Sequence, residues 1–404
     1  MTKQKKQHVL ILVENLPVPF DRRVWMEATT LQQAGYQVHV VCPTSDRHPE
    51  RRETLDGVKI RRYPLGLEGR SSLGTLAEYA WALMCMTWHV FIVSLKVPVK
   101  VVHVCNPPDL LFLATWPARL IRRAKTIFDQ HDLCPELWEA KGHSLDGFYA
   151  RALLKAEAST YRWADVVIST NESYKHIATT RGEKNPDNVF VVRSAPRKDF
   201  AVTQIQATRS AQDAHRIAYV GTMGAQEGID ILLDAIKVLV TERGRNTLRC
   251  DIIGGGPERD ALKALSESLG LSEYVTFHGR VSDEDMRSII MNADIGVNPD
   301  RPSTMNSLSS MNKIVEYMAL GIPMVQFDCV EGKRTALDSS RYVTEPTASG
   351  LAKALHELLE DASGRESMRT FGLDRFNTAL CWEAQYPNLL GAYAHLAPIP
   401  TTQI

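Results

Sequence analysis

Short apolar runs alternate with longer amphipathic segments along most of the chain. Residues 9–14 form an apolar run typical of a strand, residues 23–34 place apolar side chains at helical spacing, and residues 37–42 are apolar again. Gly35 directly follows the helical segment, where glycine commonly ends a helix. The pattern therefore predicts a strand–helix–strand unit at the start of the chain.

The same alternation continues through the first half of the chain. Helices are predicted near 73–96, after Pro107-Pro108 and near 148–163, and further strands at 58–63, 99–105, 125–129, 165–170 and 189–193. Strands that alternate with helices pair in parallel and are covered on both faces. This half is therefore expected to form a parallel sheet between two layers of helices.

A polar stretch at 199–214 interrupts the alternation, which then resumes. The second half predicts strands at 216–220, 249–253, 275–278, 295–298 and 324–327, and helices at 228–243, 257–269, 282–291, around Lys313 and at 347–360. A chain of 404 residues favours two domains over a single core. We expect domains at 1–200 and 216–380, a linker at 201–215, and a C-terminal helix within 381–404 that packs back across both domains.

Charge and cysteine content narrow the class of protein. Lysine plus arginine and aspartate plus glutamate each total 47, so no net field attracts nucleic acid. The seven cysteines are scattered without metal-ligand spacing, which favours a reducing, cytoplasmic setting. The apolar run after Lys3, Lys5 and Lys6 is too short for a secretory signal.

Residues 79–95 form the longest uncharged apolar stretch. Its 17 residues are marginal for a membrane span and include Thr87 and His89. We interpret the stretch as a buried or interfacial helix. The wider segment 73–95 is expected to pack in the core, with contact to a membrane surface as the alternative.

A polar loop that leads into a short helix at 310–323 is the strongest chemical signal. The helix carries Lys313 and Glu316 three residues apart, and Gly321 and Pro323 end it before an apolar strand. Backbone N–H groups at a helix start bind phosphate, and a carboxylate accepts protons from sugar hydroxyls. The combination predicts a nucleotide-sugar site.

Several motifs in a fixed order carry a family resemblance. They are the runs at 219–221 (YVG), 251–257 (DIIGGGP), 275–281 (VTFHGRV), 292–294 (NAD) and 313–323, together with 128–136 (FDQHDLCPE) and 170–173 (TNES) in the first half. In this order the chain resembles the retaining family 4 glycosyltransferases of the GT-B fold. The resemblance implies an α/β protein of two doubly wound, Rossmann-like domains that face a central cleft. It also implies transfer of a hexosyl or N-acetylhexosaminyl group, with retention, from a nucleoside-diphosphate sugar to a hydroxyl.

The resemblance assigns the donor to the second half, with Glu316 on the ribose hydroxyls. Two departures stand out, because Thr222 and Glu227 occupy positions where the family presents an arginine and a lysine to the diphosphate, and Leu308 occupies the position of a second glutamate. We expect other cations, led by Lys313, and backbone amides at 224–228 and 310–312 to replace them. The donor-side candidates are Arg193, Gly221, Thr222, Gly224, Gly255, Arg280, Asn306, Ser310, Met311, Asn312, Lys313 and Glu316.

Purely structural roles remain open for several of these positions. Residues 254–256 can form a plain tight turn, Lys313 can be a solvated helix lysine, and Asn306 with Ser309 and Ser310 can belong to an ordinary polar loop. Arg197 is a further candidate cation for the diphosphate.

The first half supplies the second catalytic candidate and the acceptor side. His131 follows a predicted strand, and by resemblance it hydrogen-bonds the donor sugar, so that His131 and Glu316 are the catalytic pair. Arg22, Arg23, Asp129 and Asp132 are the acceptor-side candidates. Two arginines at a helix start call for an anionic neighbour, either a phosphate-bearing acceptor or an acidic side chain such as Glu27. Asp132 can instead cap the helix after Pro135.

No metal or other cofactor is expected. The acidic run 283–285 follows Ser282, and a serine before such a run is better explained as a helix cap than as a metal site. The expected partners are a UDP- or GDP-sugar, a glycan or polyprenyl-diphosphate acceptor in cell-envelope or exopolysaccharide synthesis, and peripheral contact with the inner membrane surface from the cytoplasmic side.

Other functions remain as alternatives. They are a weak or inactive GT-B sugar-binding protein, suggested by the departures at Thr222, Glu227 and Leu308, and a nucleotide-sugar epimerase. A Rossmann-type oxidoreductase is disfavoured, because no Gly-x-Gly follows the first strand.

Overall fold

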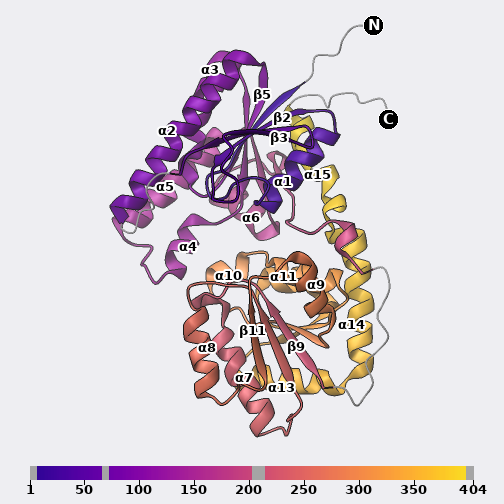
Figure 1. Ribbon diagram of the computed structural model, residues 1–404. Coiled ribbons are helices and arrows are strands. Elements are labelled where there is room, and N and C mark those ends of the chain that lie inside the picture. The colour runs from indigo at the N-terminus through magenta and orange to yellow at the C-terminus, as the bar shows by residue number, and fades with distance from the viewer. Residues whose placement is uncertain (1–6, 66–71, 203–213, 397–404) are drawn as a thin grey trace. The chain divides into compact units, whose positions relative to one another are not determined.

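The computed structural model describes residues 7–65, 72–202 and 214–396, and the chain divides into two compact units (Figure 1). Unit 1 comprises Met1–Arg193 and Gln385–Ile404, and unit 2 comprises Ser194–Ala384. Each unit contains one sheet flanked by helices. Two parallel-sheet α/β domains are therefore confirmed.

The sheet of unit 1 has the strand order β3-β4-β2-β1-β5-β6-β7-β8. The strands are β1 (His8–Leu12), β2 (Gln37–Pro43), β3 (Arg52–Leu55), β4 (Val58–Tyr63), β5 (Val99–Cys105), β6 (Lys125–Gln130), β7 (Val166–Ser169) and β8 (Val189–Val191). All neighbours pair in parallel except β3 and β4, which form an antiparallel hairpin. The sequence did not predict β3, because this edge strand is short and its residues, RETL, are mostly polar.

The helices of unit 1 connect these strands as crossovers. They are α1 (Arg22–Gln33), α2 (Ser72–Lys96), the 3-10 helix η1 (Asp109–Thr115), α3 (Trp116–Arg122), α4 (Cys134–Ala140), α5 (Phe148–Trp163) and α6 (Glu172–Thr180). The helix predicted after Pro107-Pro108 is thus two consecutive elements, η1 and α3. The C-terminal helix α15 (Trp382–Leu396) joins unit 1 from Gln385 onward.

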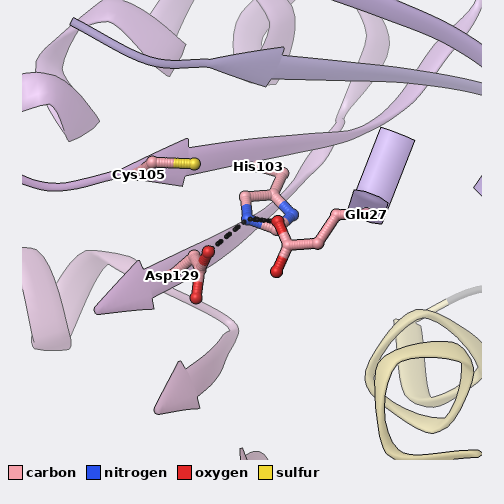
Figure 2. Close-up of side chains that lie close together, drawn as sticks. All are labelled: Glu27, His103, Cys105 and Asp129. Carbon is pink, nitrogen blue, oxygen red and sulfur yellow. Dashed lines mark ion pairs between the residues drawn. The ribbon is translucent and has the colours of Figure 1, made fainter. Parts of the chain in front are cut away.

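The strand order of unit 1 reverses between β1 and β5, and in open α/β sheets ligands bind at the carboxyl ends of strands beside such a reversal. Buried ionisable side chains lie near this place. Figure 2 shows Glu27 of α1, His103 and Cys105 of β5, and Asp129 of β6 gathered together.

The sheet of unit 2 has the strand order β11-β10-β9-β12-β13-β14 and is parallel throughout. Its strands are β9 (Arg216–Val220), β10 (Arg249–Ile253), β11 (Val275–Gly279), β12 (Ile295–Asn298), β13 (Met324–Phe327) and β14 (Ser340–Val343). Its helices are α7 (Ile229–Thr241), α8 (Arg259–Ser268), α9 (Asp283–Met291), α10 (Thr304–Leu308), α11 (Asn312–Ala319), α12 (Val330–Ala336), α13 (Ala348–Glu360) and α14 (Ala362–Arg375).

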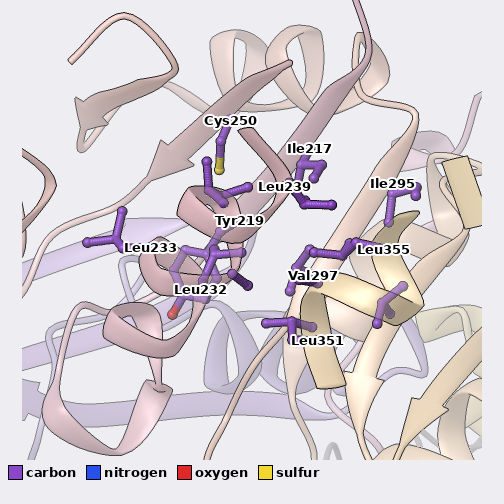
Figure 3. Packing of buried hydrophobic residues seen from close by; sticks show 14 of the residues in the cluster. Ile217, Tyr219, Leu232, Leu233, Leu239, Cys250, Ile295, Val297, Leu351 and Leu355 are labelled. Atoms are coloured by element: carbon purple, nitrogen blue, oxygen red, sulfur yellow. The ribbon is translucent and has the colours of Figure 1, made fainter. Parts of the chain in front are cut away.

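One apolar core of unit 2 lies between the sheet and helices α7 and α13. Ile217 and Tyr219 of β9 pack against Leu232 of α7 and Leu355 of α13, and all four are fully buried (Figure 3). The strand order reverses at β9, which lies between β10 and β12. The carboxyl ends of these strands are therefore the place in unit 2 where a ligand is expected.

Candidate functional site

A buried ion pair joins α1 to β6 in unit 1. The Arg23 guanidinium donates to both carboxylate oxygens of Asp129, at 3.0 and 2.7 Å, and also to the carbonyl oxygen of Val192 at 2.8 Å. A second carboxylate, Glu27, lies 3.2 Å from the same guanidinium, one helical turn along α1. The arginines at the start of this helix were expected to have an anionic neighbour such as Glu27. Arg23 has two such neighbours, Glu27 and Asp129.

His131 receives its position from Asp129. The imidazole Nε2 lies 2.5 Å from the Asp129 carboxylate, and the ring is 17% exposed. Burial works against a positive charge on this ring, but the charge of Asp129 and the hydrogen bond to it outweigh burial, so the pKa of His131 is raised. Since Nε2 faces Asp129, Nδ1 is the ring nitrogen that does not face this carboxylate.

The loop that carries His131 is fixed by a residue that the sequence did not single out. The side-chain oxygen of Asn106 accepts hydrogen bonds from the backbone N–H groups of His131, at 2.7 Å, and of Asp132, at 3.2 Å. Its side-chain nitrogen donates to Asp109 Oδ1 and to the carbonyl oxygen of Asp132. Asn106 follows β5 directly, and an asparagine at the end of a strand is a signal that could have identified it.

The second carboxylate of the cluster, Glu27, is completely buried. Its oxygens lie 3.2 Å from Arg23 and 3.6 Å from His103 Nε2. Burial and the nearby charge of Asp129 raise the pKa of Glu27 to about 7, although Arg23 and His103 oppose the shift. His103 in turn pairs through Nδ1 with the hydroxyl of Tyr393 on α15, at 2.8 Å, which links the C-terminal helix to the cluster.

Glu27, His103, Cys105 and Asp129 offer ligand atoms within 4.8 Å of one another (Figure 2). The Arg23 guanidinium already supplies the positive charge that these carboxylates require. Burial and the charge of Asp129 also raise the pKa of the Cys105 thiol well above its usual range. We therefore interpret the group as an ion-pair network.

Two of the acceptor-side candidates need correction. Arg23 is 7% exposed and Asp129 is fully buried, and they bond to one another, so neither presents its charge to an acceptor in this arrangement. Burial works against the charge on Asp129, but Arg23 and His131 hold its pKa well below its usual range. Arg22 is exposed and Asp132 is half-buried, so both remain candidates for acceptor contact.

In unit 2, two glycine-containing loops meet backbone to backbone at the ends of β9 and β10. Gly221 N–H donates to the carbonyl oxygen of Ile253 at 3.0 Å, and Met223 N–H donates to that of Gly255 at 3.0 Å. Gly254 has φ +127°, and a side chain there would lie 1.9 Å from the carbonyl oxygen of Gly221. Gly254 is thus required for the approach of the two loops, whatever binds beside them.

The lysine expected to replace the missing diphosphate cations has a carboxylate partner. Lys313 Nζ lies 2.7 Å from Asp300 Oδ1 and 4.8 Å from the centre of the Tyr219 ring, and Lys313 is only 7% exposed. The reading of Lys313 as a solvated helix lysine is therefore wrong. Burial raises the pKa of Asp300 although Lys313 opposes the shift, and its second oxygen accepts no hydrogen bond from the described residues.

The loop expected to offer backbone amides to the diphosphate is closed by Glu227. The Glu227 carboxylate accepts a hydrogen bond from Gly224 N–H at 3.0 Å. Burial, followed by the charge of Asp300, raises the pKa of Glu227. An amide counted among the candidate phosphate donors is therefore occupied by a side chain of the same loop.

Asn306 also has an internal role. Its side-chain nitrogen donates to the carbonyl oxygens of Gln226 and Arg301, at 3.0 and 2.9 Å, so both amide protons are used to hold two loops together. Asn306 lies in helix α10, where a polar loop was predicted. Ser303 caps this helix by accepting from Asn306 N–H, and its serine side chain is the sequence signal for this cap.

The remaining donor-side candidates are spread over the strand ends and over both units. Thr222, Asn312 and Arg280 are exposed, and Arg280 lies beside Gly255. Half-buried positions are Ser310, Met311 and Glu316 around the start and middle of α11, Gly221 after β9, and Arg193 at the end of unit 1. Leu308, at the position where the resembled family has a second glutamate, is the last residue of α10.

The acidic run 283–285 forms the first turn of helix α9, and Ser282 caps this helix as predicted. Ser282 Oγ accepts from Asp285 N–H at 3.1 Å at the start of α9. Sequence patterns gave no indication of two further residues that pair with candidate side chains. Asp300, the partner of Lys313, lies in the loop after β12, and Tyr393 lies 290 residues from its partner His103.

Comparisons with known proteins bear on the family and the fold of the chain. The family described as "Glycosyl transferase 4-like domain" matches residues 21–194, and "Glycosyl transferases group 1" matches residues 214–361. The alpha-D-kanosaminyltransferase of Streptomyces kanamyceticus is 30% identical over 154 residues, which is 38% of each protein. Across this and two further curated relatives, the chain spans 38%, 41% and 60% of their lengths.

Solved structures resemble the whole chain at low identity. Sucrose-phosphate synthase of Thermosynechococcus elongatus superposes with a TM-score of 0.78 at 17% identity, over 97% of this chain and 99% of that one. HepE of Anabaena, solved in complex with UDP, superposes with a TM-score of 0.68 at 13% identity, over 96% and 100%. These likenesses establish the GT-B fold, and the two family matches, one to each unit, place the chain in the group 1 glycosyltransferases with a 4-like N-terminal domain.

Proposed function

We propose that this protein transfers a sugar, with retention at the anomeric carbon, from a nucleoside-diphosphate sugar to a hydroxyl acceptor. The observation that supports this most is the convergence, at the ends of β9 and β10, of close backbone loops around Gly221 and Gly254 with the buried Lys313. A buried cation beside closely approaching glycine backbones, at the reversal point of a parallel sheet, suits a diphosphate.

The donor proposed first is a UDP-sugar. HepE, which shares the fold, was solved with UDP, and this motivates testing UDP before GDP. Glu316 lies in α11, three residues after Lys313, and its half-buried carboxylate is proposed to accept the ribose hydroxyl protons. Lys313 and Arg280 are proposed to face the diphosphate.

His131 is proposed to bind the donor sugar through Nδ1. The charge of Asp129 favours the doubly protonated ring, so that Nδ1 carries a proton to donate. An N–H group held in place by Asp129 and Asn106 orients the sugar for the reaction before the transition state is reached. The bond between the anomeric carbon and the diphosphate oxygen breaks as the diphosphate leaves toward Lys313. The acceptor oxygen bonds to the anomeric carbon on the same face, and its proton passes to the departing diphosphate oxygen.

The finer assignment extends to the acceptor and the setting. A hexosyl or N-acetylhexosaminyl group is proposed to go to a lipid-linked or polysaccharide precursor in cell-envelope or exopolysaccharide synthesis, on the cytoplasmic side of the membrane. No metal is proposed. Exposed Arg22 and half-buried Asp132 are the side chains proposed to face the acceptor.

A second candidate function, sugar binding without transfer, has a specific observation behind it. Lys313 is paired with Asp300 and Gly224 N–H with Glu227, so two groups expected to hold the diphosphate are occupied by carboxylates. Activity and binding therefore have to be measured separately.

The test uses purified full-length protein with UDP- and GDP-sugars and a lipid extract as the acceptor source. We expect nucleoside diphosphate release that rises with the extract, and a loss of kcat of about 100-fold in His131→Ala. Glu316→Gln is expected to raise KM for the donor about tenfold. The exposed Glu284 of α9 provides the matched control, Glu284→Gln, which should leave both constants unchanged.

Three other outcomes would change the assignment. Donor binding without release in the presence of acceptor would favour the binding protein. Conversion of the nucleotide-sugar into its epimer would favour the epimerase. Binding of no nucleotide-sugar, with unchanged behaviour of both variants, would refute the proposed function.

A further inference from the structure

Helix α2 is apolar on two faces. The inner face packs into the core of unit 1 through Ala82, Met86, Val90 and Val93. The outer face exposes large apolar side chains at intervals of three, four and seven residues, namely Trp81 (39%), Met84 (58%), Trp88 (60%) and Leu95 (53%). A surface helix of a soluble domain usually presents polar residues outward, so this outer face calls for a partner.

The exposed apolar surface continues onto the elements packed against α2. From η1 and α3, the exposed side chains are Leu110, Leu113, Trp116 and Leu120, the last of which is 75% exposed. A hollow of about 500 Å³ lies between α2 and α3. It is lined by Met84, Trp88 and Phe91 of α2 and by Trp116 and Pro117 of α3. We call the outer faces of α2, η1 and α3 the apolar surface.

Cations gather at one end of the apolar surface. Residues 79–100 and 110–123 contain Lys96, Lys100, Arg119, Arg122 and Arg123 and no aspartate or glutamate, while the half-buried Glu78 lies toward the other end of α2 and Asp109 of η1 is buried. The Arg122 guanidinium donates to the carbonyl oxygens of Ser94 and Leu95, at 2.6 and 3.1 Å, which holds this end of α3 against the end of α2. The exposed cations Lys96 and Arg123 therefore lie on two elements that are tied together.

We propose that the apolar surface docks unit 1 on a bilayer that contains anionic phospholipids. Tryptophan rings favour the boundary between headgroups and acyl chains, and lysine and arginine are attracted to anionic headgroups. A second copy of the chain fits less well, because a symmetric contact would bring cations of the same sign together. The inference does not depend on the proposed transferase activity.

The structure favours an interfacial position over a span for α2. The segment Ala77–Lys96 is long and apolar enough to cross a membrane, and 28% of this window is buried. Its inner face, however, supplies Met86 and Val90 to the core of unit 1. A span would remove these side chains from the core, whereas an interfacial position leaves the core intact and buries only the outer face.

The test is flotation of the purified full-length protein with two kinds of vesicle, phosphatidylcholine alone and phosphatidylcholine mixed with phosphatidylglycerol. We expect binding to the mixed vesicles, with a blue shift of tryptophan fluorescence, and release at about 1 M salt, where screening is strong. Trp88→Ser/Leu120→Ser is expected to reduce the partition coefficient about tenfold. Lys96→Glu/Arg123→Glu is expected to reduce binding to mixed vesicles about tenfold.

Matched controls come from exposed residues of unit 2. Val330→Ser removes an apolar side chain that is 44% exposed, and Arg243→Glu reverses an exposed charge. Both should bind the mixed vesicles as the unaltered protein does, and thermal unfolding should show that every variant is folded. Absence of binding to either vesicle would overturn the proposal. So would a dimer in lipid-free solution that Trp88→Ser/Leu120→Ser dissociates, or salt-independent binding that is equal for both vesicles.

Discussion

Each unit buries an ionic cluster, and the two clusters are balanced in opposite ways. In unit 1, Asp129 faces two cationic groups, Arg23 and His131, and its pKa is held well below its usual range. In unit 2, the single cation Lys313 faces Asp300, and burial raises the pKa of that carboxyl. The first cluster keeps Asp129 ionised and so holds His131, a catalytic candidate, in place. The second has one cation, Lys313, for the two carboxylates of Asp300 and Glu227.

This difference indicates that internal carboxylates of unit 2 compete with an anionic ligand. The groups in unit 2 that suit a diphosphate, Lys313 Nζ and Gly224 N–H, already serve Asp300 and Glu227. A diphosphate that binds there must displace these carboxylates or bind after they are protonated, and their raised pKa values favour protonation. Donor affinity is therefore expected to be set by the competition between ligand and internal carboxylates.

The largest effect is expected from breaking the unit 1 cluster with Asp129→Asn. The substitution leaves Arg23 and His131 without their shared carboxylate in a buried setting, which costs about 3–5 kcal/mol of unfolding free energy. Urea unfolding measures the loss. NMR titration should also show that the pKa of His131 falls, because the charge that raised it is gone.

The exposed pair of Lys333 and Asp328 provides the control for this prediction. Its atoms lie 3.0 Å apart, with side chains 55% and 31% exposed, so Asp328→Asn should change stability by about 0.5 kcal/mol or less. Equal losses in the two variants would show that the unit 1 cluster contributes no more than a surface pair.

The next largest effect concerns the cation-poor cluster. Lys313→Met should destabilise unit 2 by about 2–3 kcal/mol at neutral pH, because Asp300 is then buried without a cation. The loss should shrink as the pH falls, since protonation neutralises Asp300. In urea unfolding, the double variant Lys313→Met/Asp300→Leu should recover most of the loss, and strictly additive losses would contradict the pairing.

The sequence predicted the elements of both clusters but not their pairings. Strand and helix positions follow from local apolar periodicity, so β5, β9 and α11 were predicted closely. Arg23 and Asp129 are 106 residues apart, and their contact depends on which strands become neighbours in the sheet. Asp300 is a single aspartate in a loop, and only the folded chain brings it to Lys313. Burial of these side chains is likewise a property of the packed units.

A smaller effect is expected from the pH dependence of the unit 1 cluster. The pKa of Glu27 is about 7 in the fold against an ordinary value of 4.5, so the folded chain binds an additional proton between these values. Its contribution to stability is complete below about pH 4.5 and is lost as the pH rises through about 7. Glu27→Gln should therefore reduce the fall in unfolding free energy between these pH values, by about 2 kcal/mol.

The matched measurement for Glu27 is urea unfolding of both proteins across this pH range. Burial also raises the pKa values of Glu14 and Glu157 to about 7, so a part of the slope with the same sign should remain in Glu27→Gln. Parallel curves for the two proteins would mean that Glu27 is ionised in the fold across the whole range.

The smallest effect tests the other side of the comparison by adding a cation to unit 2. Glu227→Lys removes a carboxylate that occupies Gly224 N–H and places a lysine where the resembled family has one. If internal carboxylates limit anion binding, the Kd for UDP should fall about tenfold, or about 1.4 kcal/mol, in calorimetry at low salt. The same charge change at Asp260, whose side chain is 95% exposed on α8, should leave the Kd unchanged.

Equal gains in both variants would indicate a general effect of net charge, and weaker binding in Glu227→Lys would mean that the Glu227 loop closure supports the ligand. A selective gain would identify the Glu227 carboxylate as a group in unit 2 that opposes the binding of an anion.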